Sequence, residues 1–134
     1  MNELVQKLMK LEKSISSKKG RFLLFALFLS EEAQDKWDLL AAAPWISKDK
    51  GGSLKYLADK VQRALDSKEI VRLSRIVIID EDNIALDAIH RAVNIEHGKA
   101  EIRDSVFFGL DIKHAYLITS QREDSSAPTN KVNM

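Results

Sequence analysis

Residues 22–29 read FLLFALFL, eight apolar residues in succession. An apolar run of this length, without alternating polar residues, is typical of a strand that is buried on both faces of a sheet. The run is too short to cross a bilayer as a helix, which takes about 20 residues. It therefore predicts a central strand in a sheet that other elements cover on both sides.

An amphipathic helix is predicted upstream of this strand, over residues 3–17. Its apolar residues recur at helical spacing and form one stripe, which consists of Leu4, Leu8, Leu11 and Ile15. Gly20 follows and is expected to end the helix, because glycine adopts the left-handed cap conformation freely. Residues 1–13 carry charges throughout and contain no apolar core stretch, so we do not expect a signal peptide.

Similar patterns predict the elements that follow the central strand. Apolar or alternating runs predict strands at 37–43 and 76–79, around Ile102, and at 112–119. Helical spacing predicts a helix that Ser53 caps, a short helical turn at 68–73, and a helix over 83–96 that Gly98 closes. Because the segment from 76 to 102 reads as strand, helix and strand, we expect its two strands to pair in parallel through a right-handed crossover.

The predicted order along the chain is α-β-β-α-β-α-β-β. This order favours an α/β fold with a mixed five-stranded sheet, covered by three or four helices. Residues 1–120 are expected to form a single domain. Residues 121–134 have almost no apolar content and no periodicity, so they predict a disordered C-terminal tail.

Composition limits the chemistry that this chain can perform. None of the 134 residues is cysteine, which excludes disulfides, thiolate metal sites and thiol nucleophiles. Because small secreted domains usually carry disulfides, we expect a cytoplasmic protein. The net charge is +1, yet residues 1–21 hold six basic and two acidic residues, and residues 80–104 hold three basic and seven acidic residues. Such blocks favour self-association or an oppositely charged partner, unless they interleave in the folded chain.

Clustered carboxylates offer one candidate for catalysis. Asp80, Glu81 and Asp82 follow an apolar strand and precede a helix, which is where ligands bind in open α/β sheets. Carboxylate oxygens are suitable ligands for Mg²⁺. The same residues are also explained without a ligand, since Asp80 or Asp82 would cap the helix and the acids would favour its dipole.

Strand carboxylates offer a second candidate. The segments Glu101-Ile-Arg103 and Asp111-Ile-Lys113 resemble the acid-x-Lys signature of the PD-(D/E)XK nucleases, with Asp38 or Asp104 as the second carboxylate. The resemblance implies metal-dependent cleavage of phosphodiesters. Alternating charges on a half-exposed strand produce the same spacing by default.

Together these observations support an alternative function, a metal-dependent enzyme of nuclease-like or phosphatase-like type. Its candidate catalytic residues are Asp80, Asp82, Glu101, Asp111, Lys113 and His114. The other two histidines, His90 and His97, are seven residues apart and lack the HExxH spacing of helical zinc sites. Phosphate-loop and nucleophile-elbow motifs are missing from the sequence, so we expect no cofactor and consider a non-enzymatic role more consistent with the chain.

A second alternative is an accessory protein that binds nucleic acid. Lys18, Lys19 and Arg21 form a basic cluster, and contacts of this kind with phosphates give salt-dependent affinity. The sequence carries no RRM, KH or zinc-finger signature. The cluster is equally explained as a solvated helix face.

Aromatic residues next to turns favour an interaction surface. Trp45 follows Pro44, and Phe107 and Phe108 precede Gly109. Consecutive residues of a strand point to opposite faces, so one of the two phenylalanines is expected to be exposed or to pack against a second subunit, unless helices on both faces of the sheet bury both. The leading prediction is therefore a small cytoplasmic protein-interaction module that forms a homodimer or binds another protein, with no membrane partner.

Overall fold

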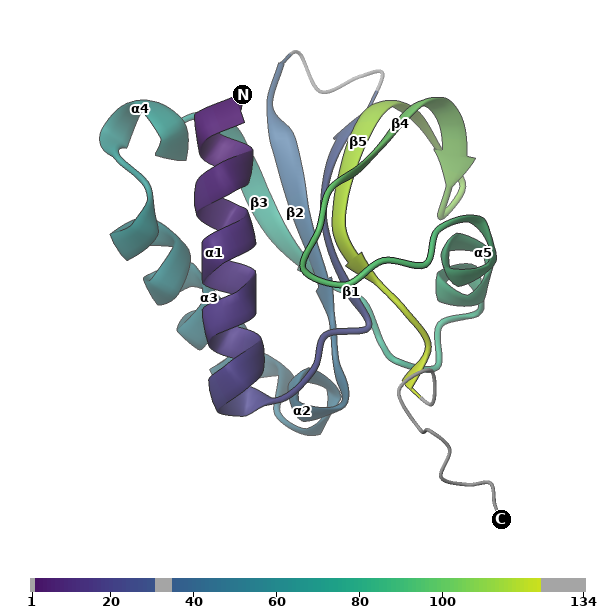
Figure 1. Cartoon of the computed structure of the whole chain (residues 1–134), viewed down its shortest axis with the longest axis horizontal. Coiled ribbons are helices and arrows are strands. Elements are labelled where there is room, and N and C mark those ends of the chain that lie inside the picture. The colour runs from purple at the N-terminus through teal and green to yellow at the C-terminus, as the bar shows by residue number, and fades with distance from the viewer. Residues whose placement is uncertain (1, 31–34, 124–134) are drawn as a thin grey trace.

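A computed structural model describes residues 2–30 and 35–123 (Figure 1). Its five strands are β1 (Leu24–Ser30), β2 (Trp37–Ala42), β3 (Leu73–Ile78), β4 (Ala100–Phe107) and β5 (Leu110–Ser120). They form one sheet in the order β3-β2-β1-β5-β4, in which β2 and β3 run parallel and the other neighbours run antiparallel. The predicted mixed five-stranded sheet and its order along the chain are confirmed, with the apolar run 22–29 at its centre.

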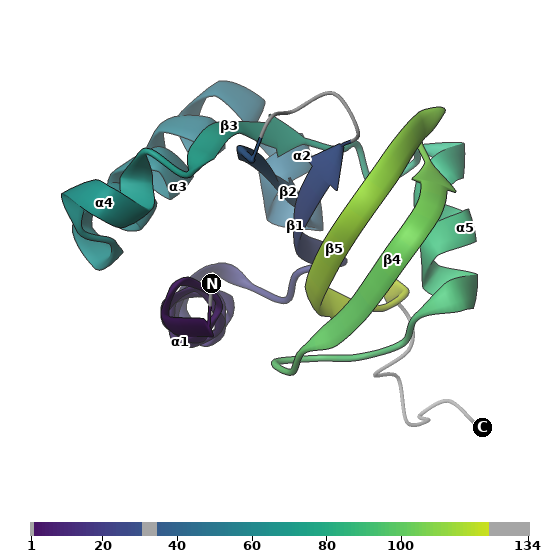
Figure 2. The same cartoon turned by 90° about the horizontal axis from the view of Figure 1, so that it is seen from above.

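Helices lie on both faces of this sheet. They are α1 (Asn2–Lys19), α2 (Pro44–Lys48), α3 (Lys50–Ala64), α4 (Ser67–Ile70) and α5 (Ile84–Ala92). Figure 2 shows α1 and α3 on one side of the sheet and α5 on the other. The described chain thus has five helices, one more than the upper number predicted. The additional helix, α2, has Pro44 in its first turn, where the missing N–H of proline costs no hydrogen bond.

The central strand β1 contributes to two apolar cores. Phe25 and Leu27 pack toward α1 and α3, whereas Leu24 and Ala26 pack toward the face that carries α5. Both sets are fully buried. Because alternate side chains of a strand point to opposite faces, burial on both sides requires apolar residues throughout, as the sequence has.

The predicted crossover between strands 76–79 and 100–106 is wrong. β3 and β4 lie at opposite edges of the sheet, and the parallel pair is β2 with β3, which α2, α3 and α4 connect. The physical reason is local pairing. β4 and β5 are joined by a turn of two residues and form a hairpin, and β5 takes the place beside β1.

Two predicted helix boundaries also differ from the structure. The helix expected over 83–96 ends at Ala92, so His97 and Gly98 lie outside it, and Asn83 caps its start instead of Asp80 or Asp82. After Ala92 the backbone becomes extended, and Ile95 forms an isolated bridge with β5. β-Branched residues there lower the helix propensity and favour extended structure.

The cap of α3 is Asp49 instead of the predicted Ser53. The Asp49 side chain accepts a hydrogen bond from the Gly52 N–H at 3.1 Å. Ser53 is buried inside the helix. Among the described residues, no helix is long and apolar enough to cross a membrane.

The predicted C-terminal tail lies mostly outside the described residues, which end at 123. Within the described part, Gln121 is buried. Its side-chain amide donates to the Phe22 carbonyl at 3.0 Å. The domain described here therefore includes at least Gln121.

Candidate functional site

An apolar groove opens on the α5 face of the sheet, between β3 and the turn that joins β4 to β5. Its volume is about 230 Å³. The apolar residues that line it come from four strands, the position just after β3, and the turn: Phe28, Leu40, Val77, Ile79, Phe108, Leu110 and Ile112. Because α5 has only nine residues, with Leu86 and Ile89 as its buried contacts, it leaves this part of the face open.

Two of the predicted interface residues, Phe107 and Phe108, belong to this region. Their ring centroids lie 5.7 and 6.3 Å from that of Phe28. The expectation that these neighbours point to opposite faces is wrong. Phe108 lies in the turn with a φ of +56°, which brings its side chain to the same face as Phe107.

The rim of the groove carries an ion pair. Arg75 Nε and Nη2 lie 3.3 and 3.4 Å from the two carboxylate oxygens of Asp38. Asp38 was predicted as a possible metal-binding carboxylate, and the structure instead pairs it with a guanidinium. The pair leaves the groove apolar with a neutral rim.

The two edge strands of the sheet differ in composition. β3 contains one charged residue, Arg75, among Leu73, Ile76, Val77 and Ile78. β4 carries Glu101, Arg103 and Asp104, and Asp104 adopts a left-handed φ of +52° that interrupts the regular strand. Charges and irregularities of this kind prevent edge-to-edge pairing. β4 is therefore protected against pairing, whereas β3 is not.

A second open surface lies where α1 ends. The Trp45 indole N–H donates to the Gly20 carbonyl at 3.1 Å, and the Lys19 ammonium lies 5.7 Å from the Trp45 ring centroid and 4.9 Å from that of Tyr56. Two hollows of about 380 and 480 Å³ adjoin these residues, and Lys19 and Trp45 line both. The structure thus brings Trp45, predicted as an interface residue, together with Lys18 and Lys19, predicted as nucleic-acid contacts.

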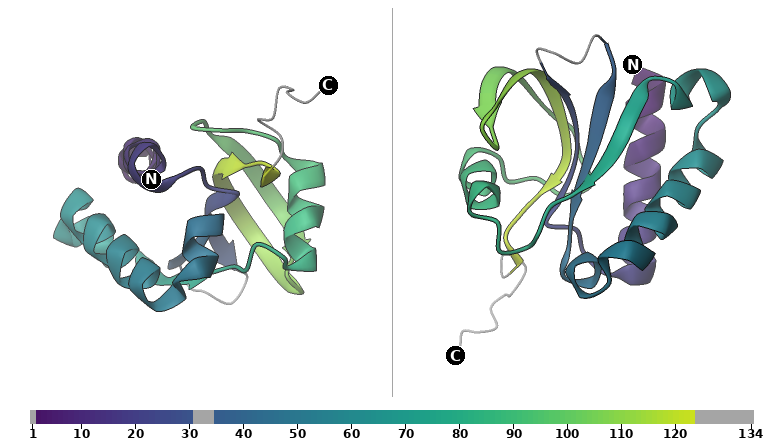
Figure 3. Two further views of the ribbon diagram at one scale, coloured as in Figure 1. Left: turned by 90° about the horizontal axis from the view of Figure 1, so that it is seen from below. Right: turned by 180° about the vertical axis from the view of Figure 1, so that it is seen from behind.

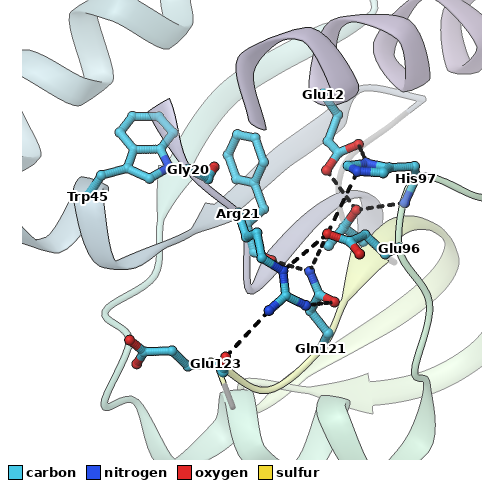
Figure 4. Close-up of polar contacts among 10 residues, drawn as sticks. Glu12, Gly20, Arg21, Trp45, Glu96, His97, Gln121 and Glu123 are labelled. Atoms are coloured by element: carbon cyan, nitrogen blue, oxygen red, sulfur yellow. Dashed lines mark hydrogen bonds and ion pairs between the residues drawn. The ribbon is translucent and has the colours of Figure 1, made fainter. Parts of the chain in front are cut away.

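Arg21, the third residue of the predicted basic cluster, belongs to a different group. Its Nε lies 3.3 Å from Glu96 Oε2, and the guanidinium also donates to the Gln121 side chain and the Glu123 carbonyl (Figure 4). Burial raises the pKa of Glu96, but hydrogen bonds from Gln121 and Arg21 outweigh this effect and hold its pKa below the usual range.

A buried carboxylate lies beside this group. Glu12 is fully buried on α1. Its Oε1 lies 2.6 Å from His97 Nδ1, and its Oε2 accepts a hydrogen bond from the Thr119 hydroxyl at 2.8 Å. The Thr119 oxygen in turn accepts from the His97 backbone N–H at 3.1 Å. Figure 4 shows Glu12 reaching from α1 toward His97.

The Glu12–His97 pair combines a carboxylate with an imidazole, as catalytic sites for nucleophilic attack do. Such a site also needs a nucleophile that is hydrogen-bonded to the histidine, and the described residues provide none here. The Thr119 hydroxyl donates to Glu12 and not to the histidine, and His97 Nε2 lies 3.7 Å from Glu96 Oε2. With a carboxylate near each ring nitrogen, His97 is best explained as a polar clamp between α1 and β5. Sequence reasoning missed Glu12, although it lies four residues after Leu8 on the apolar face of α1.

The strand candidates come together only in part. His114 Nε2 lies 2.6 Å from Glu101 Oε2, and Arg103 donates to the same oxygen at 2.9 Å. The hydrogen bond from His114 lowers the pKa of the Glu101 carboxyl. Asp111 and Lys113 are exposed, and their side chains make no hydrogen bond or ion pair with any described residue.

The carboxylates before α5 do not converge either. Asp80 pairs with Lys50 at 2.5 Å, and the Glu81 N–H donates to the Ser47 hydroxyl. Glu81 and Asp82 are exposed. Across residues 2–30 and 35–123, no group of three or more histidine or acidic side chains is placed to hold a metal ion.

No protein-family model, curated protein or solved structure matches this chain. Two open surfaces remain as candidate sites. One is the groove beside β3, and the other is the lysine–aromatic surface, which consists of Lys18, Lys19, Trp45, Lys48 and Tyr56.

Proposed function

We propose that this protein is a small interaction module that self-associates as a homodimer through the outer edge of β3. The observation that carries the proposal is the contrast between the two edges of the sheet. β4 holds three charged residues and a left-handed Asp104, whereas the outer edge of β3 pairs with no described strand and is largely apolar. An unprotected edge is a template for a further strand.

The hydrogen-bonding groups of β3 are available for such a strand. The Ile79 N–H donates to the Ala41 carbonyl of β2 at 2.9 Å. Because backbone groups alternate along a strand, the N–H groups of Ile76 and Ile78 point to the open edge. The right-hand view of Figure 3, from behind the molecule, shows β3 with a neighbouring strand on only one side of it.

A second copy of the chain fits the charge of this edge. A two-fold interface brings the same patch of both copies together. Any uncompensated charge on one copy would therefore face the same charge on the other copy. The charged residue of β3, Arg75, is already paired with Asp38. Two β3 edges would therefore meet without repulsion.

The groove adds apolar area to the same interface. Val77 of β3 and Ile79, the residue just after β3, line it. In an antiparallel β3–β3 pairing, both copies keep their α5 faces on the same side, so their grooves adjoin across the new sheet. Burial of apolar surface there stabilises the dimer by roughly 25 cal/mol per Å² before association costs.

Light scattering during size-exclusion chromatography tests the proposal with two matched substitutions. The wild-type protein is expected at twice the chain mass of 15.2 kDa. Val77→Lys places a charge in the groove beside the β3 edge, at a partly buried position, and is expected to give a monomer. Val106→Lys makes the same change on β4, where Val106 is 64% exposed, and is expected to remain a dimer.

Circular dichroism of both variants separates dissociation from unfolding. A monomeric wild-type protein at about 100 µM, a concentration far above the Kd of a stable dimer, would overturn the proposal. Dissociation by Val106→Lys and not by Val77→Lys would place the interface on the other edge. A monomer that forms complexes only with another protein would point to a heterologous partner.

A further inference from the structure

We infer that the lysine–aromatic surface at the end of α1 is a binding site for single-stranded nucleic acid. The surface consists of Lys18, Lys19, Trp45, Lys48 and Tyr56. It lies apart from β3 and does not depend on the proposed dimer. Its charge, its aromatic rings and its shape each support this ligand.

The basic residues that line the two hollows outnumber the acidic ones. Lys18, Lys19 and Lys48 are exposed and form no ion pair with any residue within 2–30 or 35–123. Two acidic residues also line the hollows: Asp49, which accepts the hydrogen bond that caps α3, and Glu123. Three unpaired ammonium groups on one surface suit an anion with several charges, such as a phosphate backbone.

The aromatic rings favour a ligand with bases. Trp45 and Tyr56 are partly exposed and stand edge to face, with ring centroids 6.1 Å apart and planes at 88°. Lys19 lies near both rings, so it would exchange these cation–π contacts for a phosphate when a base stacks. Stacked bases on aromatic side chains beside lysines are the usual mode of sequence-tolerant single-strand binding.

The shape of the surface supports an extended strand. One hollow reaches from Trp45 toward Pro44 and Lys48, and the other reaches from Trp45 toward Lys18 and Tyr56. Both hollows are open to solvent, and they share Lys19 and Trp45. A duplex would present its bases only in its grooves, whereas a single strand can place a base against the ring and phosphates in both hollows.

Titration with a fluorescein-labelled 20-mer of thymidine tests this inference in the full chain. Trp37 is 4% exposed, so quenching of tryptophan emission would report on Trp45. With three phosphate contacts, affinity is expected to fall about twentyfold between 50 and 200 mM salt. Poly-glutamate and anionic lipid vesicles serve as competing polyanions and are expected to bind weakly and without quenching.

Three variants assign the binding to this surface. Lys19→Gln is expected to weaken binding and to reduce the slope of log affinity against log salt by about 0.7. Tyr56→Leu keeps an apolar side chain but removes the ring, and is expected to weaken binding about tenfold. Lys113→Gln, an exposed lysine on β5, is the matched control and is expected to bind as the wild type does.

The inference fails if the 20-mer does not bind at 50 mM salt, or if poly-glutamate or vesicles bind equally well. Equal effects of Lys19→Gln and Lys113→Gln would also overturn it, because binding would then reflect overall charge. Val77→Lys, which is expected to dissociate the dimer, is expected to bind the 20-mer as the wild type does. The test of the dimer and the test of this binding site can therefore fail independently of each other.

Discussion

Glu12 occupies a position on α1 that its apolar stripe would give to a leucine. It lies four residues after Leu8, and both are fully buried. A buried carboxylate is costly unless hydrogen bonds satisfy it. Here His97 and the Thr119 hydroxyl supply those bonds, so one side chain ties α1 to β5 and to the loop before β4.

Replacing Glu12 tests this clamp. Glu12→Ala leaves the His97 and Thr119 groups without their partner, and is expected to lower the free energy of unfolding by about 2–4 kcal/mol. Urea denaturation measures the change. Lys13→Ala, at the exposed neighbouring position, is the control and is expected within about 0.5 kcal/mol of the wild type. A similarly small effect of Glu12→Ala would show that the clamp contributes little.

His90 makes stability depend on pH. Burial lowers its pKa, although a hydrogen bond to the Leu23 carbonyl at 2.8 Å partly opposes this effect. The unfolded chain therefore takes up a proton on this group before the folded chain does. The stability that His90 contributes is complete above its unfolded pKa of about 6.5 and is lost as pH falls through the lower folded value.

Thermal unfolding between pH 8 and 5 measures this dependence. The Tm of the wild type is expected to fall on acidification from about pH 6.5. His90→Gln keeps a donor for the Leu23 carbonyl without a group that titrates, so its Tm is expected to fall less over the same range. An unchanged pH dependence in the variant would contradict this account. The pKa values of Asp87, Glu96 and Glu101 are also lowered. These carboxylates affect the stability of the fold only at lower pH, below about 4.5.

At the scale of elements, Gly20 links the end of α1 to the surface around Trp45. Its φ is +127°, and an added Cβ would lie 3.2 Å from Trp45 Cδ1. Gly20→Ala is expected to lower the free energy of unfolding by about 1–2 kcal/mol. Gly51→Ala, within α3 and with nothing near its Cβ position, is expected to raise it by up to about 1 kcal/mol. Urea denaturation of both variants is expected to show changes of opposite sign in the free energy of unfolding. Changes of the same sign would contradict the structure.

Most elements were predictable because they depend on local patterns. The eight-residue apolar run determined β1, and helical spacing located α1, α3 and α5. Helix ends were less predictable, since the end of α5 at Ala92 depends on Ile95 pairing with β5. The positions of β3 and β4 at opposite edges depend on contacts between distant strands, which sequence periodicity does not contain.

The candidate surfaces were predictable as residues but not as groups. Lys18, Lys19 and Trp45 were identified separately, for two different functions, and the turn at Gly20 brings them together. His114 and Glu101 were also identified, but their pairing depends on the β4–β5 register. Glu12 and His97, 85 positions apart, gave no joint signal in the sequence.

At the scale of the whole molecule, the charge blocks interleave in part. Arg21 pairs with Glu96, and Lys50 pairs with Asp80, so the basic and acidic segments meet in the folded chain. Lys18 and Lys19 remain outside these pairs. The molecule therefore presents two open features, a neutral apolar edge at β3 and an unpaired basic surface around Trp45.

Hydrogen–deuterium exchange at two protein concentrations tests the β3 interface most directly. At about 100 µM, the segment 73–78 is expected to exchange slowly, because the outward N–H groups of Ile76 and Ile78 would be bonded to a second copy, and at about 1 µM it is expected to exchange faster. Segment 100–107 of β4 serves as the internal control and is expected to exchange at the same rate at both concentrations. Exchange in 73–78 that does not change with concentration, in a protein whose mass is that of one chain, would contradict the account.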